Sequence, residues 1–181
     1  MALKSTVYKA DLQITDLDRH YYANHPLTLA LHPSETEERL MVRLLAFAHN
    51  ASEFLQFTQG LDNPDDPALW EKDLTGALLH WIDLGQPDER RLQKACGRAE
   101  RVSVYCYGGN STTMWWSQLV GKLGRLDNLT VLRLPEAELP ALTALASRSL
   151  RLEITIQDGE WFVSSEGAEL TLHPEVLFPL R

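Results

Sequence analysis

The segment from Gly76 to about Ala99 constrains the fold of this chain more than any other, because it reads as a strand, a tight turn and a helix in succession. The apolar strand carries the carboxylate of Asp83 at its end, a Gly-Gln-Pro turn occupies residues 85–87, and Pro87 begins the helix. Proline is favourable in a first helical turn because its missing N–H would have no helical partner there. The helix opens acidic and then becomes basic. An acid at a strand end that faces cations on the next helix is an arrangement suited to phosphate chemistry.

The first helix is predicted by signals at its N-terminus. Ser34 as the N-cap and Glu37 three residues later form a capping box. An apolar stripe at helical spacing follows, formed by Leu40, Met41, Leu44, Leu45 and Ala48. We therefore expect a helix over residues 35–49.

The remaining elements alternate between strands and helices. Residues 6–15 alternate strictly between apolar and polar side chains, which predicts a half-buried strand, and a second strand follows around Leu29. Further strands are expected at 52–58, 76–85, 101–107, 129–134, 150–157, 161–164 and 169–173, with helices at 87–99, from Asn110, and at 135–147. This mixed order favours one central sheet with helices packed on it. No repeat or long linker divides the chain, so a single domain over residues 1–181 is expected.

Composition bounds the function more than the fold. The chain has 181 residues, 44% of them hydrophobic, which suits an ordinary globular protein with one full core. Its net charge of -8 would repel nucleic acid, which is polyanionic. Contact with a nucleic acid or nucleotide therefore needs a local basic patch, and a protein partner is the other interpretation. The candidate patch consists of Arg90, Arg91, Lys94 and Arg98, with Arg101 nearby.

The sequence lacks the motifs of several classes of protein and of several kinds of site. The N-terminus has no apolar core of a secretory signal, and no apolar run approaches the roughly 18 residues needed to cross a bilayer, so we expect a cytoplasmic protein. Cys96 and Cys106 lie in apolar segments and are expected to be buried, reduced thiols. The six histidines are scattered without metal-binding spacing. No nucleophile elbow, phosphate-binding loop or dinucleotide fingerprint occurs, so no organic cofactor is expected.

Asp83 is the first candidate site residue. It shares one face of its strand with the apolar residues Leu79 and Trp81, where an unpaired charge is costly. In a structural interpretation the carboxylate hydrogen-bonds the following turn or pairs with an arginine. In a functional interpretation it is a metal ligand. The residues alone leave both open.

Three further residues are candidates beside Asp83. Glu38 lies on the shoulder of the first helix's apolar stripe, where it is either a helix-dipole charge or a site residue. Arg91 lies on the shoulder of the stripe formed on the next helix by Leu92, Ala95, Cys96 and Ala99. It is therefore the cation best placed to turn toward Asp83, and we expect the two to form a charge pair. Lys94 reaches that site only by snorkelling or if the helix is rotated.

Several motifs carry a close resemblance to the YaeQ family, small bacterial proteins of largely unknown function. The resemblance runs essentially from end to end. Its two long and specific motifs are His32-Pro-Ser-Glu-Thr-Glu-Glu-Arg39 and Trp81-Ile-Asp-Leu-Gly-Gln-Pro-Asp-Glu-Arg-Arg91. Shorter matches are Met-Ala-Leu-Lys at the start, Trp115-Trp116 and Ile156-Gln-Asp-Gly159.

The resemblance implies a variant of the PD-(D/E)XK, or restriction-endonuclease-like, architecture: an α/β fold with a mixed central sheet flanked by helices, an added N-terminal hairpin and a C-terminal β-meander. Active members hold Mg²⁺ between two acids on neighbouring strands, with a lysine beside the second acid and often a glutamate on the preceding helix. Carried over, Glu38 matches the helix glutamate and Asp83 the acid of (D/E)-x-K. Gly85 stands where the lysine belongs, so a catalytic cation would have to come from Arg91 or, second, Lys94.

The acid on the neighbouring strand is Asp66 or Asp73. On one continuous strand Asp73 and Asp83 would be ~33 Å apart, too far to share an ion. If residues 73–76 form a hairpin turn, the residue opposite Asp83 lies near position 66, which favours Asp66. If the segment folds back through a short helix around Trp70, Asp73 is favoured instead.

Two functions follow from these observations. The first is a non-catalytic interaction or regulatory protein that has kept the fold and an acidic cleft. The second is a nuclease or phosphodiesterase that depends on Mg²⁺ or Mn²⁺ and uses Glu38, Asp83 and either Arg91 or Lys94. The acidic net charge and the missing lysine favour the first, and fold analogy alone is weak evidence for the second.

Overall fold

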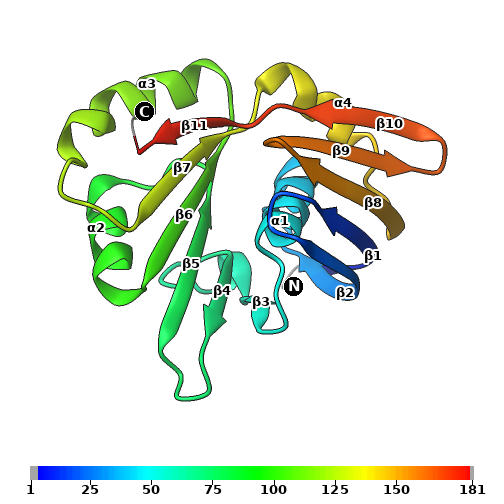
Figure 1. Ribbon diagram of the computed structural model, residues 1–181, viewed down its shortest axis with the longest axis horizontal. Coiled ribbons are helices and arrows are strands. Elements are labelled where there is room, and N and C mark those ends of the chain that lie inside the picture. The colour runs from blue at the N-terminus through cyan, green and yellow to red at the C-terminus, as the bar shows by residue number, and fades with distance from the viewer. Residues whose placement is uncertain (1–3, 180–181) are drawn as a thin grey trace. The chain divides into compact units, whose positions relative to one another are not determined.

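The computed structural model describes residues 4–179, so most of the expected N-terminal motif Met-Ala-Leu-Lys lies outside the described residues. The chain forms two compact units (Figure 1). The first unit comprises Met1–Ala51 and Ala137–Pro174, and the second comprises Ser52–Glu136 and Glu175–Arg181.

The first unit contains a five-stranded sheet of order β10-β9-β8-β1-β2. Its strands are β1 (Thr6–Asp16), β2 (Tyr21–Leu31), β8 (Ser149–Gln157), β9 (Glu160–Ser165) and β10 (Ala168–Leu172). β1 pairs antiparallel with β2 and parallel with β8. The alternation predicted for β1 is confirmed, because its apolar face is buried: Tyr8, Ala10, Leu12 and Ile14.

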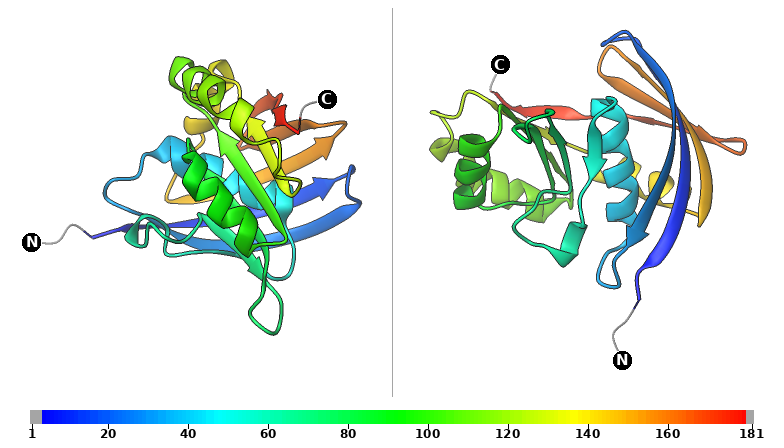
Figure 2. Two further views of the ribbon diagram at one scale, coloured as in Figure 1. Left: turned by 90° about the vertical axis from the view of Figure 1, so that its left-hand side faces the viewer. Right: turned by 90° about the horizontal axis from the view of Figure 1, so that it is seen from below.

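Helix α1 (Glu37–Asn50) belongs to the same unit, and the curved sheet lies against it (Figure 2). The predicted stripe is buried, but burial extends around the helix from Leu40 to Ala48. The predicted capping box is wrong. Thr36 is the N-cap and accepts a hydrogen bond from the Arg39 N–H at 3.1 Å. The predicted helix at 135–147 is also shorter, with a 3-10 turn at Glu136–Glu138 and α4 at Leu139–Thr143.

The second unit contains a six-stranded mixed sheet of order β11-β7-β6-β5-β4-β3. Its strands are β3 (Leu55–Phe57), β4 (Leu69–Lys72), β5 (Leu78–Leu84), β6 (Arg101–Cys106), β7 (Leu129–Arg133) and β11 (Glu175–Phe178). β3, β4 and β5 are antiparallel neighbours, whereas β5, β6 and β7 are parallel. The helices α2 (Glu89–Arg98) and α3 (Asn110–Leu119) connect the parallel strands.

The core of the second unit lies between these two helices and one face of the sheet. It joins α2, α3, β6 and β7 through Leu92, Ala95, Val102, Val104, Cys106, Leu119, Val131 and Phe178, among others. The stripe predicted for α2 is therefore confirmed. The helix begins two residues after Pro87, with Asp88 as N-cap. At α3 the N-cap is Gly109, so the cap predicted at Asn110 is off by one residue.

The single central sheet expected from the sequence is wrong, because the structure has two sheets. The N-terminal hairpin does not extend the sheet that contains β5. Instead, β8 occupies the second edge of β1 and brings the C-terminal meander into a sheet of its own. The strands β4 and β11 were not expected, since four residues each give too little alternation to stand out. Among the described residues, no helix is long and apolar enough to cross a membrane.

Candidate functional site

Asp83 lies near the C-terminal end of β5 in the second unit. It is 3% exposed, beside Trp81 and Ile82, which are equally buried. Its neighbour on β6 is Val104. The strand places a carboxylate in an apolar environment, where its charge requires hydrogen bonds and a partner.

Arg91 is that partner, as the sequence predicted. Its Nε donates to Asp83 Oδ2 at 2.8 Å and its Nη2 donates to Asp83 Oδ1 at 2.9 Å. The contact is thus bidentate, the geometry in which a planar guanidinium binds a carboxylate best. The hydrogen bond to Asp83 raises the pKa of Arg91 above its ordinary value, although partial burial opposes the shift.

The Asp88 side chain helps to position Arg91 in the first turn of α2. Its Oδ1 accepts a hydrogen bond from the Arg91 N–H at 2.8 Å and thereby caps the helix. The cap and the ion pair fix both the backbone and the guanidinium of Arg91. Helix α2 is therefore attached to the end of β5 by side chains as well as by the short turn.

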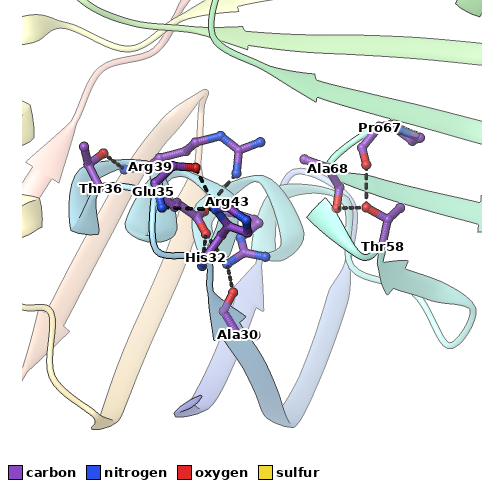
Figure 3. A network of polar contacts seen from close by, with 10 residues as sticks. Ala30, His32, Glu35, Thr36, Arg39, Arg43, Thr58, Pro67 and Ala68 are labelled. Carbon is purple, nitrogen blue, oxygen red and sulfur yellow. Dashed lines mark hydrogen bonds and ion pairs between the residues drawn. The ribbon is translucent and has the colours of Figure 1, made fainter. Parts of the chain in front are cut away.

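The same guanidinium also binds the loop before β4. Nη1 donates to the carbonyl of Pro64 at 2.6 Å, and Nη2 donates to the carbonyl of Asp66 at 2.8 Å. Farther along, Thr58 Oγ1 donates to the Pro67 carbonyl at 2.5 Å and pairs the ends of this loop (Figure 3). Arg91 therefore connects β5, α2 and the loop at 60–67 through one side chain.

Asp66 contacts the Asp83–Arg91 pair with its main-chain carbonyl and not with its carboxylate. Asp73–Ala77 forms a hairpin turn, and Leu69 pairs with Ile82, so the hairpin alternative for this segment is confirmed. The Asp66 carboxylate accepts from Asn63 Nδ2 at 3.0 Å, whereas its carbonyl accepts from Arg91.

Asp73 lies at the opposite end of β5 from Asp83. Its Oδ1 accepts hydrogen bonds from the Thr75 hydroxyl at 2.6 Å, the Thr75 N–H at 2.8 Å and the Ala77 N–H at 3.0 Å. These bonds, with that from the Thr75 hydroxyl first, lower the pKa of the exposed Asp73 carboxyl. Asp73 therefore shapes the hairpin turn, and the structure does not bring it to Asp83.

The donor set around Asp83 does not fit a bound Mg²⁺. Magnesium needs a near-octahedral shell of oxygen ligands at about 2.1 Å. Both Asp83 oxygens instead contact the cationic Arg91 guanidinium, which an ion would have to displace. Across residues 4–179, no group of three or more His, Cys, Asp and Glu side chains is arranged to hold a metal ion.

A cavity of about 460 Å³ opens beside Arg91. It is lined by Asp65, Trp81, Asp88, Arg90, Arg91, Lys94 and Ala95. Arg90 and Lys94 are both exposed and lie four residues apart on α2. Arg98 is not free of contacts, because its guanidinium lies 5.4 Å from the centre of the Trp81 ring.

Glu38 lies in the first unit, whereas the site around Asp83 consists only of residues of the second. It occupies the first turn of α1 and is half-buried. Within residues 4–179 it makes no hydrogen bond or ion pair. Its neighbour Glu37 accepts a hydrogen bond from the Tyr8 hydroxyl at 3.3 Å.

A second carboxylate–arginine cluster, in the first unit, was not predicted (Figure 3). Glu35 Oε1 accepts from Arg39 Nη1 at 2.8 Å, and Glu35 Oε2 accepts from Arg43 Nη2 at 3.1 Å. Arg43 Nη2 also donates to the Ala30 carbonyl at 2.9 Å. The signal available in the sequence was the spacing of four and eight residues from Glu35 to the two arginines.

Comparison with known proteins agrees with the motifs quoted above. Residues 1–174 match the family model described as "YaeQ protein". The chain is 43% identical over 173 residues to "Uncharacterized protein YaeQ" from Escherichia coli (strain K12), covering 96% of both chains. The corresponding protein of Salmonella typhi is 44% identical over 164 residues, 91% of both chains.

Solved structures agree as well. The YaeQ protein from Xanthomonas axonopodis pv. citri superposes with a TM-score of 0.93 at 51% identity, over 96% of this chain and 98% of that one. The YaeQ protein from Pseudomonas syringae gives a TM-score of 0.92 at 39% identity over 97% of both chains. With the family model, the relatives and the fold in agreement, the chain belongs to the YaeQ family.

Proposed function

We propose that this protein is a non-catalytic binding or regulatory protein of the cytoplasm, in which an arginine has closed an ancestral acidic site. The observation that carries the proposal is the bidentate pairing of Arg91 with both oxygens of Asp83. A carboxylate held in this way is neutralised inside the protein and is not free to bind an ion or a water molecule. We infer that Asp83 now stabilises the fold.

The proposal includes descent from a restriction-endonuclease-like ancestor. Between α1 and α2 the chain has the three strands β3, β4 and β5, and β6 follows α2. Three strands is the number usual in that superfamily, and β4 is the one that sequence patterns did not reveal. The position of the lysine in (D/E)-x-K is occupied by Gly85, which has a positive φ of 89° and provides the turn into α2.

The chemistry of the cation also favours a structural role. A lysine can transfer a proton at a hydrolytic site, whereas arginine stays protonated. The pKa of Arg91 is raised further by the hydrogen bond to Asp83, so this guanidinium is a permanent cation. Arg91 also donates hydrogen bonds to the carbonyls of Pro64 and Asp66, and it thereby links the loop before β4 to α2.

The alternative is a phosphodiesterase that depends on Mg²⁺ or Mn²⁺. The position of Asp83 at a strand end favours this alternative. The segment that contains Asp66 leads into β4, the strand paired with β5. In that case Arg91 has to leave Asp83 before a metal binds.

The experiment that separates the two combines metal binding with hydrolysis. The melting temperature of the full chain is measured with and without millimolar Mg²⁺ or Mn²⁺, because a ligand that binds only the native state raises it. Single- and double-stranded DNA and RNA are then incubated with the protein and each metal. We expect neither a metal-dependent shift nor cleavage. A shift or cleavage that disappears in Asp83→Asn would overturn the proposal.

A further inference from the structure

We propose that the cavity beside Arg91 binds the phosphate group of a small phosphate monoester, such as a sugar phosphate or a nucleoside monophosphate, and that Arg90 and Lys94 supply its cations. The inference rests on the proposed function in one respect, namely that the ligand is bound and not cleaved. It assigns a ligand to the surface next to the closed acidic site.

The first observation is that neither Arg90 nor Lys94 forms an ion pair within the described residues, although Asp65 and Asp88 also line the cavity. Both line the cavity, and neither makes a hydrogen bond or ion pair within residues 4–179. Their spacing of four residues places them side by side on α2. The nearest acid on the same helix, Glu89, is used elsewhere, because its carboxylate accepts from Gln93 at 3.0 Å and lies 3.8 Å from Lys122 Nζ. Two adjacent cations that form no ion pair are available to an anion with two charges.

The second observation is a spare donor on Arg91. A guanidinium has five N–H donors. Four of them are used, two by Asp83 and one each by the carbonyls of Pro64 and Asp66. The fifth, on Nη1, has no acceptor in the described part of the chain, and the Arg91 side chain is 31% exposed at the cavity. Three donor groups on one helix therefore line the cavity, which matches the several oxygens of a phosphate better than the two of a carboxylate.

The third observation concerns size and the remaining lining. The volume of about 460 Å³ lies within the range of about 300–1,000 Å³ typical of small-molecule sites and exceeds what inorganic phosphate fills. Trp81 and Ala95 also line the cavity, but they are only 2% and 1% exposed, so the side chains that a ligand can reach are mainly polar. Asp65 is exposed and lines the cavity, and its carboxylate makes no hydrogen bond among the described residues. It is therefore positioned to accept a hydrogen bond from a hydroxyl group of a ligand. The lining therefore fits a phosphate attached to a hydroxyl-bearing group.

The test is calorimetric titration of the full chain at pH 8, where a phosphate monoester is a dianion because its second pKa is about 6. Three probes are compared at constant ionic strength: inorganic phosphate, ribose 5-phosphate and adenosine 5′-monophosphate. We expect the two esters to bind more tightly than inorganic phosphate. Arg90→Gln and Lys94→Gln should each weaken ester binding by about tenfold, in line with the loss of one charge-assisted hydrogen bond. Arg125→Gln, which alters an exposed arginine of the same unit that does not line the cavity, should have no effect.

Two further results decide between the proposals. Asp65→Asn should strengthen binding of inorganic phosphate, since it removes a negative charge but leaves the cations unchanged. Failure of both esters to bind at millimolar concentration, or equal losses in the Arg125 control, would overturn the site while leaving the non-catalytic proposal intact. Release of inorganic phosphate from a bound ester would refute the non-catalytic proposal and not the site.

Discussion

The two carboxylate–arginine clusters follow the same local plan but differ in what surrounds them. In each, an arginine eight residues after the acid lies on the following helix and binds both the carboxylate and a main-chain carbonyl. In the first unit the Arg43 side chain is 4% exposed, and Glu35 has two arginines. In the second unit Arg91 is 31% exposed, is the sole arginine on Asp83 among the described residues, and borders a cavity.

The pKa values of the two arginines are shifted in opposite directions, in line with this difference. Burial lowers the pKa of Arg43 below its ordinary value, and the charge of Glu35 only partly compensates. The hydrogen bond to Asp83 raises the pKa of Arg91. The first cluster is sealed and acts inside the protein, whereas the second retains access to solvent. Of two similar ion pairs, the open one is therefore the better candidate for ligand binding.

The largest effect is expected when the sealed cluster loses its acid. Glu35→Gln removes the carboxylate that pairs with the buried Arg43, and breaking a buried ion pair from one side typically costs about 3–5 kcal/mol. The free energy of unfolding from urea titration measures it. Glu37→Gln, in a neighbouring exposed residue with one long hydrogen bond from Tyr8, is the matched control and should change stability by about 0.5 kcal/mol or less. Equal effects of the two variants would mean that the Glu35 cluster is not sealed.

Loss of the arginine from the open cluster should cost less. Arg91→Ala strands a buried Asp83, but water can reach the vacated space through the cavity, so about 2–3 kcal/mol is expected. Arg98→Ala is the control on the same helix and loses only its contact with the Trp81 ring, worth about 0.5–1 kcal/mol. Similar small losses in both variants, measured by the same urea titration, would show that the Asp83 pair is solvated.

The comparison also shows what the sequence could and could not predict. The pair of Asp83 and Arg91 was predictable, because a charge on an apolar strand face requires a partner and Arg91 lies on the shoulder of a clear stripe. The carbonyls of Pro64 and Asp66 were not, since main-chain acceptors have no residue-specific signal. Glu35 was missed because Ser34 was interpreted as the N-cap, which placed Glu35 in the helix.

The fold divides in the same way. Local patterns predicted β1, α1, α2 and the C-terminal meander close to their observed positions. The division into two sheets depends on the parallel pairing of β1 with β8, which joins residues such as Lys9 and Ser149. Periodicity identifies the buried face of a strand but not the strand beside it. Long-range pairing is therefore what sequence reasoning lacked.

Acid should affect the first unit through His49, a half-buried histidine. Burial, followed by the nearby charge of Arg19, lowers the pKa of His49 to about 4. An unfolded chain has a histidine pKa near 6.5. Protonation therefore favours the unfolded state between these values, so the stabilising contribution is complete above about pH 6.5 and is lost as the pH falls toward 4.

The expected loss across this window is about 2 kcal/mol, less than the full shift implies because His49 is partly exposed. The ring centroids of His49 and Trp161 are 4.8 Å apart. His49→Phe keeps an aromatic ring at this position but removes the group that is protonated. Urea titrations at pH 7 and pH 4.5 of both proteins measure the difference. A wild-type loss that persists unchanged in His49→Phe would assign the acid sensitivity to other groups.

The smallest effect is expected from Arg39→Ala, which removes one of the two arginines on Glu35. Arg43 still neutralises the carboxylate, and the Arg39 side chain is 18% exposed, so about 1 kcal/mol is expected. Arg91→Ala should cost more, although Arg91 is the more exposed of the two, because no described cation replaces it at Asp83. What sets the cost is thus whether a carboxylate keeps a partner, and exposure of the lost arginine is secondary. A larger loss from Arg39→Ala than from Arg91→Ala would reverse that order and make Arg39 the main counter-charge of Glu35.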